Sequence, residues 1–171
     1  EVLRGPQGLA YGADAGGVVN ISSRSLEQGF FANLDARSGA YGTQKVTGNI
    51  GSTNEVVDYF LSVTDAETEG YNASQADTVL RDYDGYVNTS VHGRLGINLS
   101  ENMRLDVVHR EVEGDSEFDG CFSGTAVHNC SSNYELSASR VALKYSSNNF
   151  SHSISYASTE TERESFALNT S

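Results

Sequence analysis

The sequence has no tryptophan, one proline and two cysteines among its 171 residues. A single proline beside 17 glycines excludes collagen and a proline-rich linker. No apolar stretch approaches the roughly 20 residues that a membrane-spanning helix needs. Basic residues are also scarce, because 11 Lys and Arg stand against 23 Asp and Glu, which gives a net charge of −12. Since nucleic-acid binders need clustered cations to displace counterions, this balance argues against nucleic acid as a partner.

The sequence begins at Glu1 with neither a methionine nor a secretory leader. We therefore expect an internal piece of a longer protein. Its length allows one domain, or one domain and a fraction of another.

The two cysteines, Cys121 and Cys130, flank the small and polar segment FSGTAVHN, whose composition is typical of a loop. A disulfide suits such a loop and would imply an oxidising compartment. Two alternatives stay open: a pair of free thiols, or a metal site that includes His128, although that set lacks a fourth ligand.

From about residue 29 the sequence alternates apolar and polar residues with a period of two. The pattern predicts seven strands, over 29–39, 43–52, 56–68, 86–99, 103–117, 134–146 and 150–162. Tight turns at 54–55, 100–102 and 147–149 alternate with long connections at 69–85 and 118–133. This asymmetry predicts an all-β, antiparallel up-and-down meander, and it is typical of outer-membrane barrels.

Each predicted strand has an apolar face and a face that carries charge. In the strand over 56–68, for example, Tyr59, Leu61 and Val63 share one face. A soluble sandwich also alternates, so the alternation alone does not decide between the two architectures. In a transmembrane barrel the apolar face meets lipid and the charged face meets the lumen, and charge on strand after strand favours this architecture.

Three of the predicted strands change from apolar to acidic along one face. In the first of them, Asp65, Glu67 and Glu69 follow the apolar residues at the same spacing, and 103–117 and 150–162 repeat the change. We expect a belt of carboxylates above the lipid band. The acids could be solvated strand ends that resist edge pairing, or divalent cations could bridge them to anionic groups of the outer leaflet.

The most specific motif is EVLRGPQGLAYGADAGGVVNIS, residues 1–22. It predicts a short strand, a turn begun by proline, and a glycine-rich return into a second strand. The motif resembles the end of the plug domain of TonB-dependent outer-membrane receptors. The matching residues include Arg4, Gly5, Pro6, Tyr11, Gly12, Gly16, Gly17 and Asn20. Weaker likenesses to early barrel strands of this family lie in DYDGY at 82–86 and SEFDG at 116–120.

This resemblance implies that residues 1–26 are the C-terminal part of a plug and that 27–171 are the first strands, about seven, of an incomplete transmembrane β-barrel. Such receptors lie in the bacterial outer membrane, among lipid and lipopolysaccharide. They take up scarce nutrients with energy supplied through TonB, which would bind a segment before Glu1. The expected substrate is vitamin B12 or a metal chelate such as a ferric siderophore, and the likeness is closest to the vitamin B12 receptors.

The resemblance also implies a role for one plug residue. Arg4 is expected to face the lumen wall and to pair with barrel carboxylates, of which Asp35 is one local candidate. Alternatively, Arg4 holds the plug structure together.

A calcium site is the one cofactor that the resemblance suggests. The vitamin B12 receptors bind Ca²⁺ through aspartates of an external loop, and Asp77, Asp82 and Asp84 lie in the similar loop here. Asn72 stands where those receptors have an aspartate, which removes charge from the site. A solvated acidic loop without calcium is the alternative.

No nucleophile–base–acid set can be placed in the sequence, so we do not expect an enzyme. The main competing interpretation is a secreted or surface β-sandwich that binds a partner protein. It would explain the alternation and the cysteine pair, but it leaves residues 1–22 without an explanation.

Overall fold

The computed structural model describes residues 2–4, 17–19, 28–72, 82–121 and 129–167. These residues form strands and turns only, and they contain no helix long and apolar enough to cross a membrane. The strands are β1 (Val2–Arg4), β2 (Gly17–Val19), β3 (Gly29–Ser38), β4 (Gln44–Thr53), β5 (Val57–Tyr71), β6 (Asp84–Ser100), β7 (Met103–Phe118), β8 (Cys130–Ser146) and β9 (Ser151–Ala167).

Strands β1 and β2 pair with each other in the antiparallel sense. Val2 lies opposite Val19, and Arg4 lies opposite Gly17. The two short strands predicted at the ends of the motif are therefore present, whereas the predicted turn and return between them lie outside the described residues.

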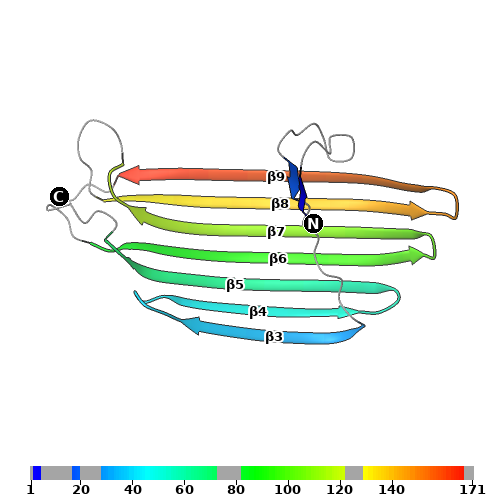
Figure 1. The fold of residues 1–171 in the computed structure, drawn as a ribbon, viewed down its shortest axis with the longest axis horizontal. Helices are drawn as coiled ribbons and strands as arrows, with labels where there is room; N and C mark the ends of the chain where they lie inside the picture. The colour runs from blue at the N-terminus through cyan, green and yellow to red at the C-terminus, as the bar shows by residue number, and fades with distance from the viewer. Residues whose placement is uncertain (1, 5–16, 20–27, 73–81, 122–128, 168–171) are drawn as a thin grey trace.

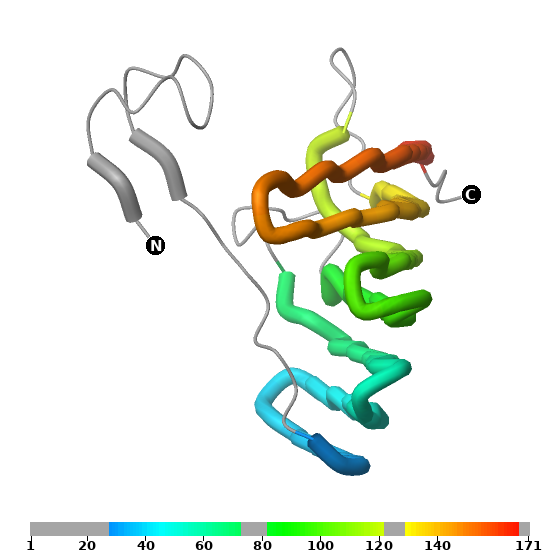
Figure 2. Tube along the Cα trace, turned by 90° about the vertical axis from the view of Figure 1, so that its right-hand side faces the viewer, coloured from blue at the N-terminus to red at the C-terminus, as the bar shows by residue number. Residues whose placement is uncertain are grey.

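The other strands form one seven-stranded sheet in the order β3-β4-β5-β6-β7-β8-β9, and each pair of neighbours is antiparallel (Figure 1). Consecutive strands are therefore always adjacent, which confirms the predicted up-and-down meander. The sheet is a single open layer (Figure 2), with β3 and β9 at its two edges.

The observed strands extend further into the long connections than predicted. Strand β5 continues to Tyr71, and the pairing of Tyr71 with Asp84 follows a register shift. Gly70, with a φ of 75°, lies at this irregularity, where a β-carbon would meet the backbone of Asp84. Strand β8 starts at Cys130, four residues before its predicted start, because Cys130 pairs with Phe118. Strand β9 runs to Ala167 and not to 162.

Three of the short turns lie at the end of the sheet opposite the long connections. In the β4–β5 turn, the side-chain oxygen of Asn54 accepts hydrogen bonds from the backbone N–H groups of Val56 (2.9 Å) and Val57 (2.8 Å). This Asx-type turn replaces ladder bonds that the backbone gives up when it reverses. We call this end of the sheet the turn end and the opposite end the loop end.

The sheet has almost no conventional core. Val112, Cys121, Cys130 and Ala142 are its buried apolar residues within the described ranges. All 17 residues of β9 are exposed. A single layer of strands buries little apolar area, so further chain or another medium is needed to cover its faces and its edges.

Candidate functional site

Cross-strand register sorts the side chains of the sheet into two faces. Tyr59 on β5 lies opposite Leu95 on β6, and Leu95 lies opposite Val107 on β7. The row continues through Val141 on β8 to Tyr156 on β9. Because side chains alternate along a strand, this row defines one face, which we call the apolar face, and the residues between define the polar face.

Large side chains on the apolar face are open to their surroundings. The exposed fractions are 42% for Leu61, 72% for Ile154 and 74% for Tyr156, while Leu105 is half-buried. No described segment encloses these side chains in a dry interior, as a second sheet would in a sandwich.

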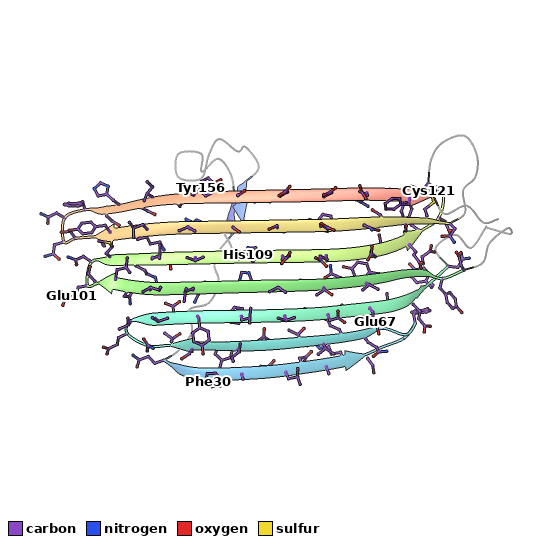
Figure 3. All side chains as sticks on the ribbon, turned by 180° about the vertical axis from the view of Figure 1, so that it is seen from behind. Phe30, Glu67, Glu101, His109, Cys121 and Tyr156 are labelled. Atoms are coloured by element: carbon purple, nitrogen blue, oxygen red, sulfur yellow. A yellow bond between two sulfur atoms is a disulfide. The ribbon has the colours of Figure 1, made fainter. Side chains whose placement is uncertain are left out.

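Acidic residues continue the apolar face toward the loop end. In Figure 3, Glu67 lies toward the end that Cys121 marks, whereas Phe30 and Tyr156 lie nearer the turn end at Glu101. The acids on this face of the strands are Asp65, Glu67, Glu69, Glu111, Glu113, Asp115, Glu117, Glu135, Glu160, Glu162 and Glu164. The register therefore confirms that the acids share a face with the apolar residues.

Three of these acids form a row of like charges. Glu113 on β7 lies directly opposite Glu135 on β8, and Glu135 lies directly opposite Glu162 on β9. Directly opposed like charges destabilise a sheet, so this row needs solvent, salt or a counterion around it.

Every lysine and arginine of β3–β9 lies on the polar face. These residues are Arg37, Lys45, Arg94, Arg104, Arg110, Arg140, Lys144 and Arg163. Four aspartates share this face: Asp35, Asp58, Asp84 and Asp106. The two faces therefore differ in charge. The polar face of the strands is net positive, whereas the apolar face carries acidic residues and no lysine or arginine.

At the turn end of the polar face the charges form a connected ionic network. Asp58 is buried and accepts hydrogen bonds from Arg104 (Nη2–Oδ1, 2.5 Å) and Arg94 (Nη2–Oδ2, 3.4 Å). Arg104 also donates from Nε to Asp106 (2.9 Å), and the ammonium group of Lys144 lies 2.9 Å from the other oxygen of Asp106. Removal of one member would leave a poorly solvated charge without its full complement of partners.

The arginine at the centre of this network crosses a whole strand. Arg104 is on β7 and Asp58 is on β5, so the guanidinium passes over Gly96 of β6. A β-carbon at position 96 would overlap Nη2 of Arg104 and would lie 2.7 Å from Oδ1 of Asp58. Glycine is therefore required at position 96 for the close approach of Arg104 to Asp58. The sequence pattern alone shows only that position 96 has no side chain on the polar face.

The middle of the polar face carries two exposed arginines, Arg110 on β7 and Arg140 on β8. Arg140 lies opposite Val108, which is two residues before Arg110, so the two arginines are diagonal neighbours. His92 lies opposite Arg110 on the other side. Within the described ranges, neither arginine forms an ion pair with a carboxylate.

The apolar face also holds a histidine–serine pair that is not evident from the sequence. His109 and Ser139 are hydrogen-bonded (Nδ1–Oγ, 2.9 Å), and Nε2 of His109 is 4.0 Å from a carboxylate oxygen of Glu111. Strand β8 is paired on both sides, so its backbone N–H groups near Ser139 are engaged in the ladders and are not available as oxyanion donors. The pair resembles part of a catalytic triad, and the backbone of β8 supplies it with no oxyanion hole.

At the loop end, a disulfide joins Cys121 to Cys130, with 6.1 Å between their Cα atoms. It ties the end of β7 to the start of β8, at the base of the connection between them. Nearby, the backbone N–H of Gly85 donates to Glu117 (3.0 Å), which links β6 to β7. A cleft of about 570 Å³ at this end is lined by residues that include Thr68, Tyr83, Tyr86, Asp115, Glu117 and Asn133.

The plug motif is described only in part. Arg4 and Gly17 are paired in the backbone, whereas Gly5, Pro6, Tyr11, Gly12, Gly16 and Asn20 lie outside the described residues. Asp35, the candidate partner of Arg4, accepts a hydrogen bond from Nε of Arg37 at 2.6 Å. The pairing of Arg4 with a barrel carboxylate stays a prediction.

Of the three aspartates expected to bind calcium, Asp77 also lies outside the described residues. Oδ1 of Asp82 is buried and has no hydrogen-bond partner within them, while Asp84 begins β6. Within the same ranges no group of three or more His, Cys, Asp or Glu side chains is arranged to hold a metal ion. The calcium site stays a prediction for the connection that contains Asp77.

Comparisons with known proteins give no family for this chain, because no protein-family model matches the sequence and no solved structure matches the fold.

Proposed function

We propose that this chain is the end of a plug domain and the first seven strands of a TonB-dependent outer-membrane receptor, which takes up a scarce nutrient. One observation carries the proposal: the sheet exposes its apolar face and gathers its ionic network on the opposite face. A soluble domain would cover this apolar face with a second layer. A transmembrane barrel turns its apolar face to lipid and its charged face to the lumen.

Other features support the same assignment. The strands are antiparallel and sequentially adjacent, with short turns at one end and longer connections at the other. Among the described strands, β3 and β9 each have one side without a neighbour, and continuation into further strands would pair them. The N-terminal motif resembles the family's plug, and its ends form the paired strands β1 and β2. The disulfide at the loop end suits an oxidising extracellular side.

In this assignment, the turn end faces the periplasm and the loop end faces the medium. The apolar face spans the lipid band, and its acids lie level with the lipopolysaccharide head groups. The polar face lines the lumen and surrounds the plug. The receptor acts as a binding protein and transporter, with no catalytic step, and TonB supplies the energy.

The competing β-sandwich would need a second sheet over the apolar face. The described residues provide none, and the acids at the loop end of that face would then be buried without cationic partners.

The test is to express the full-length reading frame that contains this chain in a Gram-negative host. We expect the protein in the outer-membrane fraction, soluble only with detergent, and with an electrophoretic mobility that changes on boiling. We also expect nutrient uptake that disappears when TonB is deleted. Recovery of a soluble, monomeric protein without detergent would refute the assignment and support the sandwich.

A further inference from the structure

Three arginines of the polar face lie at different levels along the strands, away from the ionic network, with Arg163 opposite Tyr134 and therefore roughly 20 Å along the sheet from Arg140. Arg163 lies toward the loop end on β9, and Arg140 and Arg110 lie in the middle of β8 and β7. We call these three residues the cationic track. The track leads to the ionic network at the turn end, where Asp58 and Asp106 already neutralise most of the charge.

The track lacks negative charge among the described residues. Arg163 donates to the hydroxyl of Ser132 (3.0 Å), and no carboxylate of the described ranges pairs with any of the three arginines. Arg110 and Arg140 are diagonal neighbours that repel one another, and an anion above the sheet would relieve this repulsion, as solvent or salt also can. The planar guanidinium fork suits carboxylate and similar oxyanion groups, which it binds through two parallel hydrogen bonds.

The part of the proposed plug present in this chain does not supply the missing charge. Residues 1–26 contain the acids Glu1 and Asp14 against the bases Arg4 and Arg24. This segment is close to neutral. The extension of the track along the strand direction also fits a ligand that moves from the loop end toward the turn end.

We propose that the cationic track binds a small anionic metal chelate, whose carboxylate or similar oxyanion groups contact Arg110 and Arg140 during transport. This inference rests on the proposed function and specifies its substrate class. It favours a negatively charged ferric chelate over vitamin B12, whose cyano form is neutral overall. The acids of the apolar face do not oppose such a ligand, because they lie on the other side of the sheet.

The experiment uses the full-length receptor in a host that lacks its own iron and cobalamin receptors. Radioactive uptake is measured for ferric citrate as the anionic probe, and for a neutral ferric trihydroxamate and cyanocobalamin as the neutral probes. Each is measured with and without TonB. The test variant is the double substitution Arg110→Gln and Arg140→Gln, and the conservative variant replaces both arginines by Lys. Lys45→Gln is the matched control, because it removes an exposed cation from the same face outside the track.

We expect TonB-dependent uptake of ferric citrate and little uptake of the neutral probes. The Gln variant should lower the uptake rate by about tenfold for each arginine lost, which corresponds to ~1.4 kcal/mol of lost hydrogen bonding to a charged group. The Lys variant should recover part of the rate because it restores charge without the fork, and Lys45→Gln should transport normally.

The outcomes separate the two claims. Two results would refute the anionic ligand and leave the proposed receptor function standing. One is uptake of a neutral probe alone, and the other is uptake of ferric citrate that the Gln variant leaves unchanged. If the Gln variant impairs all probes equally and makes the cells leak antibiotics, the arginines hold the plug and the inference is wrong. If no probe enters in a TonB-dependent manner, the anionic ligand is refuted, and the proposed function fails with it when the protein is also absent from the outer-membrane fraction.

Discussion

Arg104 on β7 places its guanidinium 2.5 Å from the carboxylate of Asp58 on β5, two strands away. The contact depends on the intervening Gly96, because any β-carbon there would occupy the path of the guanidinium. Three strands are therefore coupled at one point of the turn end. In the proposed receptor, this point stiffens the lumen wall near the periplasmic side.

The first prediction concerns that glycine. Gly96→Ala should move Arg104 away from Asp58, because the end of a flexible side chain yields more easily than the backbone. The buried carboxylate of Asp58 would then keep its longer contact with Arg94. The loss should lower the free energy of unfolding by about 1–3 kcal/mol. Chemical unfolding of the full-length protein in detergent measures it. Gly93→Ala on the same strand is the control, because a β-carbon there meets nothing within 4 Å. Equal effects of the two substitutions would contradict the role of Gly96.

The second prediction tests which face meets lipid. Leu61→Arg puts a charge on the apolar face, and it should cost about 2–4 kcal/mol if that position lies near the middle of the bilayer. Ser62→Arg, one residue later, puts the same charge on the polar face opposite His92 and should cost little. Unfolding of the full-length protein from lipid vesicles measures both. A larger cost for Ser62→Arg would reverse the assignment of the two faces.

Much of this fold is predictable from sequence because one periodic signal dominates it. The residues Tyr59, Leu61 and Val63 show the face of β5 directly, and all seven predicted strands are present. The errors lie at the loop end. The polar stretch that starts β8 at Cys130 has no clear alternation, and the pairing with Phe118 defines it as a strand.

The candidate site is less predictable, because its contacts depend on register. Arg104 and Asp58 are 46 positions apart in sequence, and no local pattern brings them together. The same is true of His109 and Ser139, which are 30 positions apart. The surplus of arginines on the polar face could have been found from strand alternation alone. It is inconspicuous because the chain as a whole is strongly acidic.

The third prediction concerns the disulfide at the base of the β7–β8 connection. Replacement of both Cys121 and Cys130 by Ser should destabilise the loop end by about 2–3 kcal/mol in the chain-entropy picture, because the closed loop is short. Protease cleavage between the two positions should become faster, while strands deeper in the membrane stay protected. Labelling of the untreated protein with a thiol-reactive polymer should give no mobility shift until a reductant is added. Labelling without reductant would show that the thiols are free.

The fourth prediction concerns the row formed by Glu113, Glu135 and Glu162. Glu135→Gln removes the middle charge and relieves both repulsions at once, so in EDTA and low salt it should stabilise the protein by about 0.5 kcal/mol. High salt should abolish the gain, because exposed charges are screened within about 10 Å at 0.1 M salt. Glu67→Gln is the control, since Glu67 lies opposite Gln44 and Val87 and has no acid directly across from it.

Excess Mg²⁺ separates the two interpretations of the acids. If divalent cations bridge these carboxylates, Glu135→Gln should become destabilising in Mg²⁺, whereas solvated strand ends should show only the screening that salt produces. A gain in EDTA that is the same for both substitutions would mean that the row has no special repulsion, and that the net charge of the chain alone sets the effect.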